Sequence, residues 1–122
     1  MKKHILITED NQYVLTLLEH LLESTYEVTL KEDGKEALEW LEEGNTTNLI
    51  ISDILMPNLD GYELLGQLKS SAYFKDIPVI MLSGLEKSEE RIKCFELGAD
   101  DYIVKPFNPE ELEVRVSRLI KE

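Results

Sequence analysis

Apolar runs and helix-period segments alternate along this chain of 122 residues. A short run of consecutive apolar residues indicates a buried strand, whereas apolar residues spaced three or four apart indicate an amphipathic helix. The runs predict five strands, at residues 4–8, 26–30, 48–52, 77–82 and 102–104, of which 26–30 alternates like a more exposed strand. The spaced patterns predict five helices, at residues 11–23, from Gly34 up to Gly44, from Gly61 past Leu68, at 88–97 and from Pro109 to Ile120. The first helix is expected to bury a face made of Val14, Leu17, Leu18, Leu21 and Leu22.

This alternation predicts the fold class. Five strand–helix units with near-continuous apolar central strands indicate a parallel sheet covered by helices on both faces, an α/β three-layer sandwich. A closed eight-stranded barrel would need about twice this length. No Pro/Gly/Ser-rich linker, internal repeat or low-complexity segment interrupts the pattern. We therefore expect residues 1–122 to form a single domain that is long enough to bury a core.

Composition limits which binding partners and which cellular compartment we expect for this chain. Twenty-five acidic residues stand against 13 basic ones, and the resulting formal charge of −12 opposes direct binding to nucleic acid. No stretch approaches the ~20 apolar residues of a membrane span, and the run 5–7 is too short for a signal peptide. The single Cys94 rules out an internal disulfide and is expected to be a small buried packing residue. These features predict a cytoplasmic protein.

Candidate chemistry gathers where the predicted strands end. Glu9 and Asp10 follow the first strand, Asp53 follows the third, and Ser83 and Lys105 follow the fourth and fifth. Because the carboxyl ends of parallel strands meet at one edge of a sheet, we expect these side chains to lie together. Three carboxylates in one place need a cation, and a lysine with a hydroxyl suits a phosphoryl group. The pattern indicates an aspartate built to be phosphorylated.

The same residues have simpler interpretations when each is taken alone. Glu9 and Asp10 are typical of a helix N-cap region, and Ser83 is an ordinary loop hydroxyl. Tyr102 is by default a strand aromatic at the rim of a sheet. Their occurrence together, in order and at one sheet edge, favours a shared function.

The chain resembles the receiver domains of two-component response regulators in four motifs, at residues 7–11, 53–57 with 60–61, 79–84 and 98–107. The resemblance runs from His4 to about Ile120. It implies a flavodoxin-like sheet with strand order 2-1-3-4-5. It also implies a phosphorylation-dependent signalling switch rather than an enzyme, which accepts a phosphoryl group from a sensor histidine kinase.

The resemblance assigns a metal site. It makes Asp53 the phosphoacceptor and implies Mg²⁺, or Mn²⁺, bound directly by Asp10, by Asp53 and by the backbone carbonyl of Leu55. Glu9 would hold a metal-bound water. Hard oxygen ligands with retained water suit octahedral Mg²⁺.

The resemblance also assigns a switch. Lys105 would neutralise a phosphoryl oxygen, aimed inward by a cis peptide bond before Pro106, and Ser83 would donate a hydrogen bond to another phosphoryl oxygen. After phosphorylation Ser83 would move toward the phosphoryl group, and Tyr102 would turn inward into the vacated space. Ser83 stands where the family often has threonine, so the hydroxyl is kept and a methyl group is lost.

The later segments resemble a subgroup whose receivers precede winged-helix DNA-binding domains, and this implies a dimer that controls an output domain or partner in transcription. The implied dimer face consists of Arg91, Ile92, Lys93, Phe95, Glu96, Asp100, Asp101, Glu111, Val114, Arg115 and Arg118. On the last helix Glu111, Arg115 and Arg118 share one face. The alternative is a solvated surface whose charges pair within the chain.

Two other function classes use parts of the same pattern. A haloacid-dehalogenase-type phosphatase also forms an aspartyl phosphate, but it resembles a pattern with a second aspartate where this chain has Leu55. A nucleotide-binding flavodoxin module needs a glycine-rich phosphate loop, whereas the loop at 8–11 is acidic and has no glycine. Transfer of a single labile phosphoryl group to Asp53 would distinguish a receiver from both.

Overall fold

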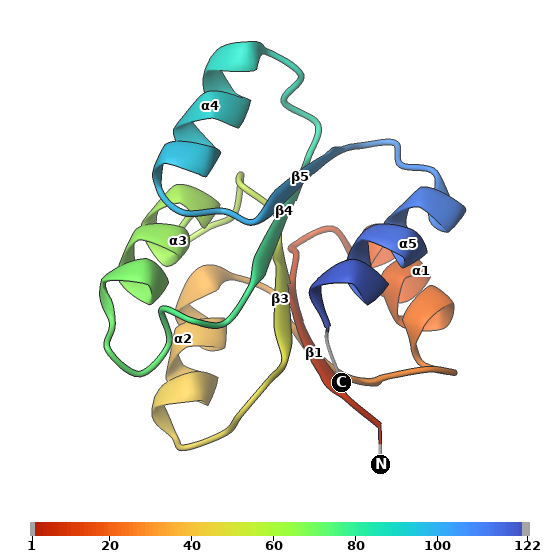
Figure 1. Ribbon diagram of the computed structural model, residues 1–122, viewed down its shortest axis with the longest axis horizontal. Coiled ribbons are helices and arrows are strands. Elements are labelled where there is room, and N and C mark those ends of the chain that lie inside the picture. Colours follow the sequence, from red (N-terminus) through yellow and green to blue (C-terminus); the bar gives the residue numbers. More distant parts are fainter. Residues whose placement is uncertain (1, 121–122) are drawn as a thin grey trace.

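The computed structural model describes residues 2–120 as a five-stranded parallel sheet between two layers of helices (Figure 1). The strands are β1 (His4–Thr8), β2 (Glu27–Lys31), β3 (Leu49–Ser52), β4 (Val79–Ser83) and β5 (Asp101–Val104). The helices are α1 (Gln12–Leu22), α2 (Gly34–Glu42), α3 (Gly61–Ser70), α4 (Ser88–Glu96) and α5 (Pro109–Leu119). The strand order is β2-β1-β3-β4-β5, which confirms the predicted flavodoxin-like α/β class.

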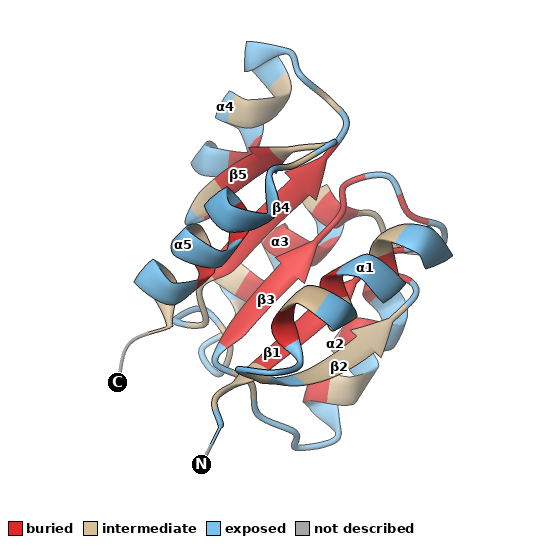
Figure 2. Ribbon diagram, turned by 90° about the vertical axis from the view of Figure 1, so that its right-hand side faces the viewer, coloured by how far each residue is buried: buried red, intermediate tan, exposed pale blue. Residues whose placement is uncertain are grey.

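Both faces of the sheet are covered, α1 and α5 lying on one and α2, α3 and α4 on the other (Figure 1). β3 and β4 are buried along their whole length, whereas the edge strand β2 is only partly buried, as its alternating sequence predicts (Figure 2). Successive residues of β1 point into different cores: Ile5 and Ile7 join the core under α1 and α5, and Leu6 joins the other. The central strands are apolar throughout because each face packs against helices.

Several element boundaries differ from the prediction by one or two residues, and the buried face of α1 differs at one position. β2 begins one residue later than expected, and β4 begins at Val79 because Pro78 has no N–H to donate to the strand ladder. α1 buries Leu15, Leu18 and Leu22, which are spaced three and four apart, whereas Leu17 is 44% exposed. Val14 and Leu21 pack partly buried against the same core, so the expected face is confirmed except that Leu15 takes the place of Leu17. A leucine-rich helix offers more than one apolar stripe, and this explains the difference.

Cys94 is fully buried on α4, which confirms its expected packing role, and burial raises the pKa of its thiol to about 11. Between residues 2 and 120 no helix is both long and apolar enough to cross a membrane.

Candidate functional site

Three carboxylates meet at the carboxyl edge of the sheet. Because β1 and β3 pair in register through Thr8 and Ser52, the residues after them come side by side, and the amide of Asp53 donates to the carbonyl of Thr8 at 3.0 Å. Carboxylate oxygens of Glu9, Asp10 and Asp53 lie within 4.8 Å of one another. Glu9 and Asp53 are buried and Asp10 is exposed. The predicted cluster is therefore present, and its oxygen ligands fit a hard divalent cation.

Lys105 supplies the positive charge of the site. Its Nζ lies 2.7 Å from Oε1 of Glu9 and 3.4 Å from Oδ2 of Asp53. The peptide bond to Pro106 is cis, as expected. Burial alone would lower the pKa of Lys105, but the hydrogen bond to Glu9 and the charge of Asp53 outweigh it and raise that pKa. The lysine therefore stays charged beside Asp53.

The electrostatics of the cluster favour an added cation. Burial, and to a smaller extent the charge of Asp53, raise the pKa of Glu9 to about 7 despite the opposing hydrogen bond from Lys105. One lysine thus does not fully offset the carboxylates. A divalent cation at this place would favour their ionised forms.

The backbone around Asp53 fixes its side chain. The amide of Ile54 donates to Oδ1 of Asp53 at 2.7 Å, and the amide of Gly61 donates to the carbonyl of Ile54 at 2.7 Å. A Cβ at position 61 would collide with the carbonyl oxygen of Asp53, so this position requires glycine. Asp60 and Glu63 form a capping box that begins α3 there. The motif Asp60-Gly61 was predicted only to open a helix; its contact with Asp53 depends on tertiary structure.

Ser83 and Tyr102 are joined through the loop after β4. Buried Ser83 accepts a hydrogen bond from the amide of Leu85 at 3.2 Å, and the hydroxyl of Tyr102 donates to the carbonyl of Leu85 at 2.6 Å. Tyr102 is only 5% exposed, and burial raises its pKa. The structure therefore has Tyr102 buried against the loop after β4, and its inward turn after phosphorylation stays a prediction.

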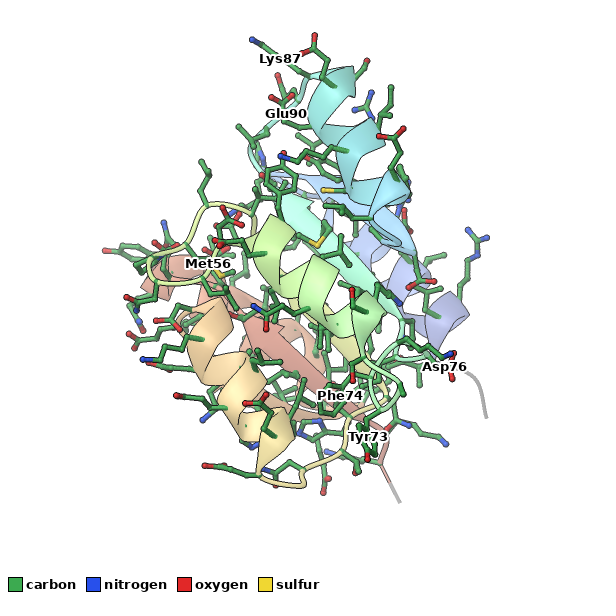
Figure 3. All side chains as sticks on the ribbon, turned by 90° about the vertical axis from the view of Figure 1, so that its left-hand side faces the viewer. Met56, Tyr73, Phe74, Asp76, Lys87 and Glu90 are labelled. Atoms are coloured by element: carbon green, nitrogen blue, oxygen red, sulfur yellow. The ribbon has the colours of Figure 1, made fainter. Side chains whose placement is uncertain are left out.

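Two leucines flank the same edge. Leu55 is 64% exposed in the loop between β3 and α3, while its neighbour Met56 is buried and accepts from the hydroxyl of Thr8 through sulfur at 3.4 Å. Met56 lies at this end of the molecule and Asp76 at the other (Figure 3). Leu85 is half-buried against the core.

The expected dimer face is partly apolar and partly paired within the chain. Its apolar members are exposed, namely Ile92, Phe95 and Val114. Arg115 binds Asp101 at 2.6 Å and lies 3.8 Å from Glu111. Among the described residues, neither Glu96 nor Arg118 takes part in an ion pair.

Two further members of this face also make internal contacts. Asp100 accepts from the amide of Val79 at 2.8 Å and lies 3.4 Å from Lys69. Lys93 places its ammonium group 3.9 Å from the centre of the Tyr62 ring, which joins α4 to α3. For part of this surface, the alternative that its charges pair within the chain therefore holds.

The structure also reveals a groove that our sequence reasoning missed. It has a volume of about 340 Å³ and is lined by Val14, Leu17, Lys105, Pro106 and Phe107. The sequence signal for this groove was Leu17 of α1, which we had assigned to the core.

Comparison with known proteins decides the family. The model of the response regulator receiver domain matches residues 5–117. This chain belongs to the response regulator receiver family. The transcriptional regulator ycf27 of Cyanophora paradoxa is 43% identical over 98% of the chain and 49% of the relative. The receiver thus spans about half the length of the ycf27 proteins it matches.

Solved structures agree with this assignment. A response regulator from Chloroflexus aurantiacus has a TM-score of 0.93 and 35% identity, with 98% of each chain covered. The receiver domain of the sensor histidine kinase PA1611 from Pseudomonas aeruginosa has a TM-score of 0.89 and 32% identity, again with 98% of each chain covered. That structure contains a magnesium ion coordinated in the active site cleft.

Proposed function

We propose that this receiver accepts a phosphoryl group on Asp53 from a phosphohistidine of a sensor histidine kinase. A carboxylate oxygen of Asp53 would bond to phosphorus as the phosphorus–nitrogen bond breaks, and the imidazole would leave as a neutral ring that keeps the proton already on its other nitrogen. The observation that carries the proposal is Lys105, 3.4 Å from Asp53 within a cluster of three carboxylates. Phosphorylation of Asp53 by a small phosphodonor in the presence of Mg²⁺ tests it.

The acid cluster would hold the metal. Asp10, Asp53 and the backbone carbonyl of Leu55 would be the direct ligands, and Glu9 would hold a metal-bound water. When bound, Mg²⁺ supplies charge that offsets the repulsion between the phosphoryl group and the carboxylates. Lys105 would exchange a carboxylate partner for a phosphoryl oxygen, and Ser83 would donate to another.

The groove beside Lys105 supports the proposal that a sensor kinase docks at this edge of the sheet. Asp53 is only 7% exposed, so a donor must bring its imidazole close to the sheet edge. Leu17 and the strongly exposed Tyr13 lie on the exposed side of α1, and the apolar groove between α1 and Phe107 adjoins Lys105. An apolar side chain of the kinase would fit this groove while its phosphohistidine faces Asp53.

Binding of Mg²⁺ should strengthen as pH rises. The pKa of Glu9 is about 7, and its ionised form is the one that can hold a metal-bound water. The ionised fraction of such a group rises roughly tenfold between about pH 6 and 8, so we expect a similar rise in Mg²⁺ affinity by calorimetry. Glu9→Gln should flatten this dependence; an equal pH dependence in that variant would contradict the assignment.

The raised pKa of Glu9 also makes folding stability depend on pH, but stability falls with rising pH whereas Mg²⁺ affinity rises. Folding raises the pKa of Glu9 from 4.5 to about 7, so the folded chain without metal binds this proton more tightly than the unfolded chain. The stability that results is fully present below about pH 4.5 and is lost as pH rises through about 7.

Phosphorylation should favour a dimer through α4, β5 and α5. The exposed Ile92, Phe95 and Val114 would form its apolar centre, and the charges of Glu96 and Arg118 its rim. With beryllofluoride, which mimics the phosphoryl group, sedimentation should show a dimer dissociation constant at least about tenfold lower. Phe95→Ser should remain monomeric, whereas the control Tyr73→Ser, at a distant exposed aromatic, should dimerise. A monomer with and without beryllofluoride would refute dimerisation.

The phosphoryl group on Asp53 should be long-lived. In the family, the approach of water is flanked by the positions two residues after the phosphoacceptor and two after the hydroxyl residue, here Leu55 and Leu85. Neither leucine can orient water, and their bulk shields the site. Leu55→Asn with Leu85→Glu should shorten the phosphoryl lifetime roughly tenfold, a barrier change of about 1.4 kcal/mol. Phosphate-release kinetics decide this, and equal rates would mean that both leucines only pack against neighbouring loops.

A further inference from the structure

A contact between two loops lies next to the proposed metal site. Asp33, in the loop before α2, is only 5% exposed, and its Oδ2 accepts from Nδ2 of Asn58 at 2.7 Å. Its Oδ1 accepts from the amide of Glu36 at 2.8 Å and caps α2. Both oxygens of this buried carboxylate are thus used, and the bond to Asn58 is the one that crosses between the loops.

Backbone contacts bring the two loops still closer. The amide of Gly34 donates to the carbonyl of Leu59 at 3.2 Å, and a Cβ at position 34 would lie 2.6 Å from that oxygen. Asn58 has φ of 68°, in the left-handed region. A residue other than glycine adopts this conformation at a cost unless surrounding contacts hold it. The bond to Asp33 is such a contact.

These contacts fix the segment that carries Leu55. Its inner part is held by the bond between Gly61 and Ile54 and by buried Met56. Its outer part is held by Asn58. The exposed Leu55 lies between Ile54 and Met56, and Asn58 holds the same loop three residues after Leu55, so we expect the backbone at Leu55 to respond to both attachments.

We propose that Asp33 and Asn58 are positioning residues for the metal: their hydrogen bond holds the loop between β3 and α3 so that the carbonyl of Leu55 can act as a ligand. This inference rests on the proposed function of Asp53. Residues that orient direct ligands typically change metal affinity by about 10–100-fold when replaced. Because Asp33 acts through a backbone segment, we expect an effect at the lower end of that range.

Two single variants separate this bond from other roles of the same residues. Asn58→Gly accepts the left-handed backbone but removes the amide. Asp33→Ser still caps α2 but is too short to reach Asn58. The matched control is Asn45→Gly, which removes an amide that donates to the carbonyl of Trp40 at 2.7 Å in an exposed loop outside the site.

Calorimetric Mg²⁺ titration, thermal unfolding and phosphorylation by a small phosphodonor are then compared with the parent chain. Asn58→Gly and Asp33→Ser should each raise the Mg²⁺ dissociation constant about tenfold, while the phosphorylation rate at saturating Mg²⁺ stays within about twofold. Asn45→Gly should match the parent. Lower thermal stability with an unchanged Mg²⁺ dissociation constant would overturn the inference, because the bond would then be merely structural.

An exchange variant tests the pair itself. In Asp33→Asn with Asn58→Asp the donor and the acceptor change places and the net charge is kept, so Mg²⁺ affinity should return to within about threefold of the parent. An exchange no better than the single variants would overturn the pairing. If the parent itself neither binds Mg²⁺ nor takes a phosphoryl group on Asp53, the proposed function fails; if the parent does both and the single variants equal it, only the positioning role fails.

Discussion

Replacing Asp53 by asparagine is expected to abolish phosphorylation. The amide is no substitute for the carboxylate nucleophile, although it can still accept the 2.7 Å hydrogen bond from the amide of Ile54 and so keep the local backbone. Transfer of labelled phosphate from a small phosphodonor should fall to background in Asp53→Asn.

The matched control for this variant is Asp60→Asn. Asp60 is an acid close to the site in sequence, but its side chain caps α3, and asparagine caps helices equally well. This control should be phosphorylated at nearly the parent rate. Normal adduct formation in Asp53→Asn would mean that the phosphoryl group is carried by another residue.

Replacing Asp10 by asparagine is expected to weaken Mg²⁺ binding more than any other single change in the acid cluster except those at Asp53. Asp10 would be a direct ligand, so its loss should exceed the roughly 10–100-fold range that outer residues show. Glu9→Gln should stay within that range, because Glu9 would act through a bound water. Phosphorylation should require correspondingly more Mg²⁺ in each variant.

Calorimetric titration with Mg²⁺ measures these differences. Asp76→Asn serves as the control, since Asp76 is an exposed acid at the far end of the sheet (Figure 3). Equal affinities for Asp10→Asn and the control, or full phosphorylation in EDTA, would contradict the metal assignment.

Much of the fold was predictable because apolar periodicity reports directly on burial. The predicted strands at 4–8 and 48–52 correspond closely to β1 and β3, and strands that end in acids necessarily bring those acids to one edge. The strand order was not available from periodicity and came from the resemblance. The cluster of Glu9, Asp10 and Asp53 was therefore predictable, whereas the distances from Lys105 were not.

The features that we missed depend on how neighbouring elements meet. Leu17 was assigned to the core because α1 has more leucines than its buried stripe can use, and the groove beside Phe107 was lost with it. The contact of Asp33 with Asn58 joins residues 25 positions apart, and no local pattern predicts it. Side-chain pairing on the expected dimer face, such as Arg115 with Asp101, likewise depends on tertiary structure.

The most direct test is the intact mass of the chain after incubation with Mg²⁺ and a small phosphodonor, followed by peptide mapping. We predict a single labile phosphoryl group, carried by Asp53 and absent when EDTA replaces Mg²⁺. An unmodified chain, a phosphoryl group at another residue, or continuous turnover of the phosphodonor without a stable adduct would contradict the account.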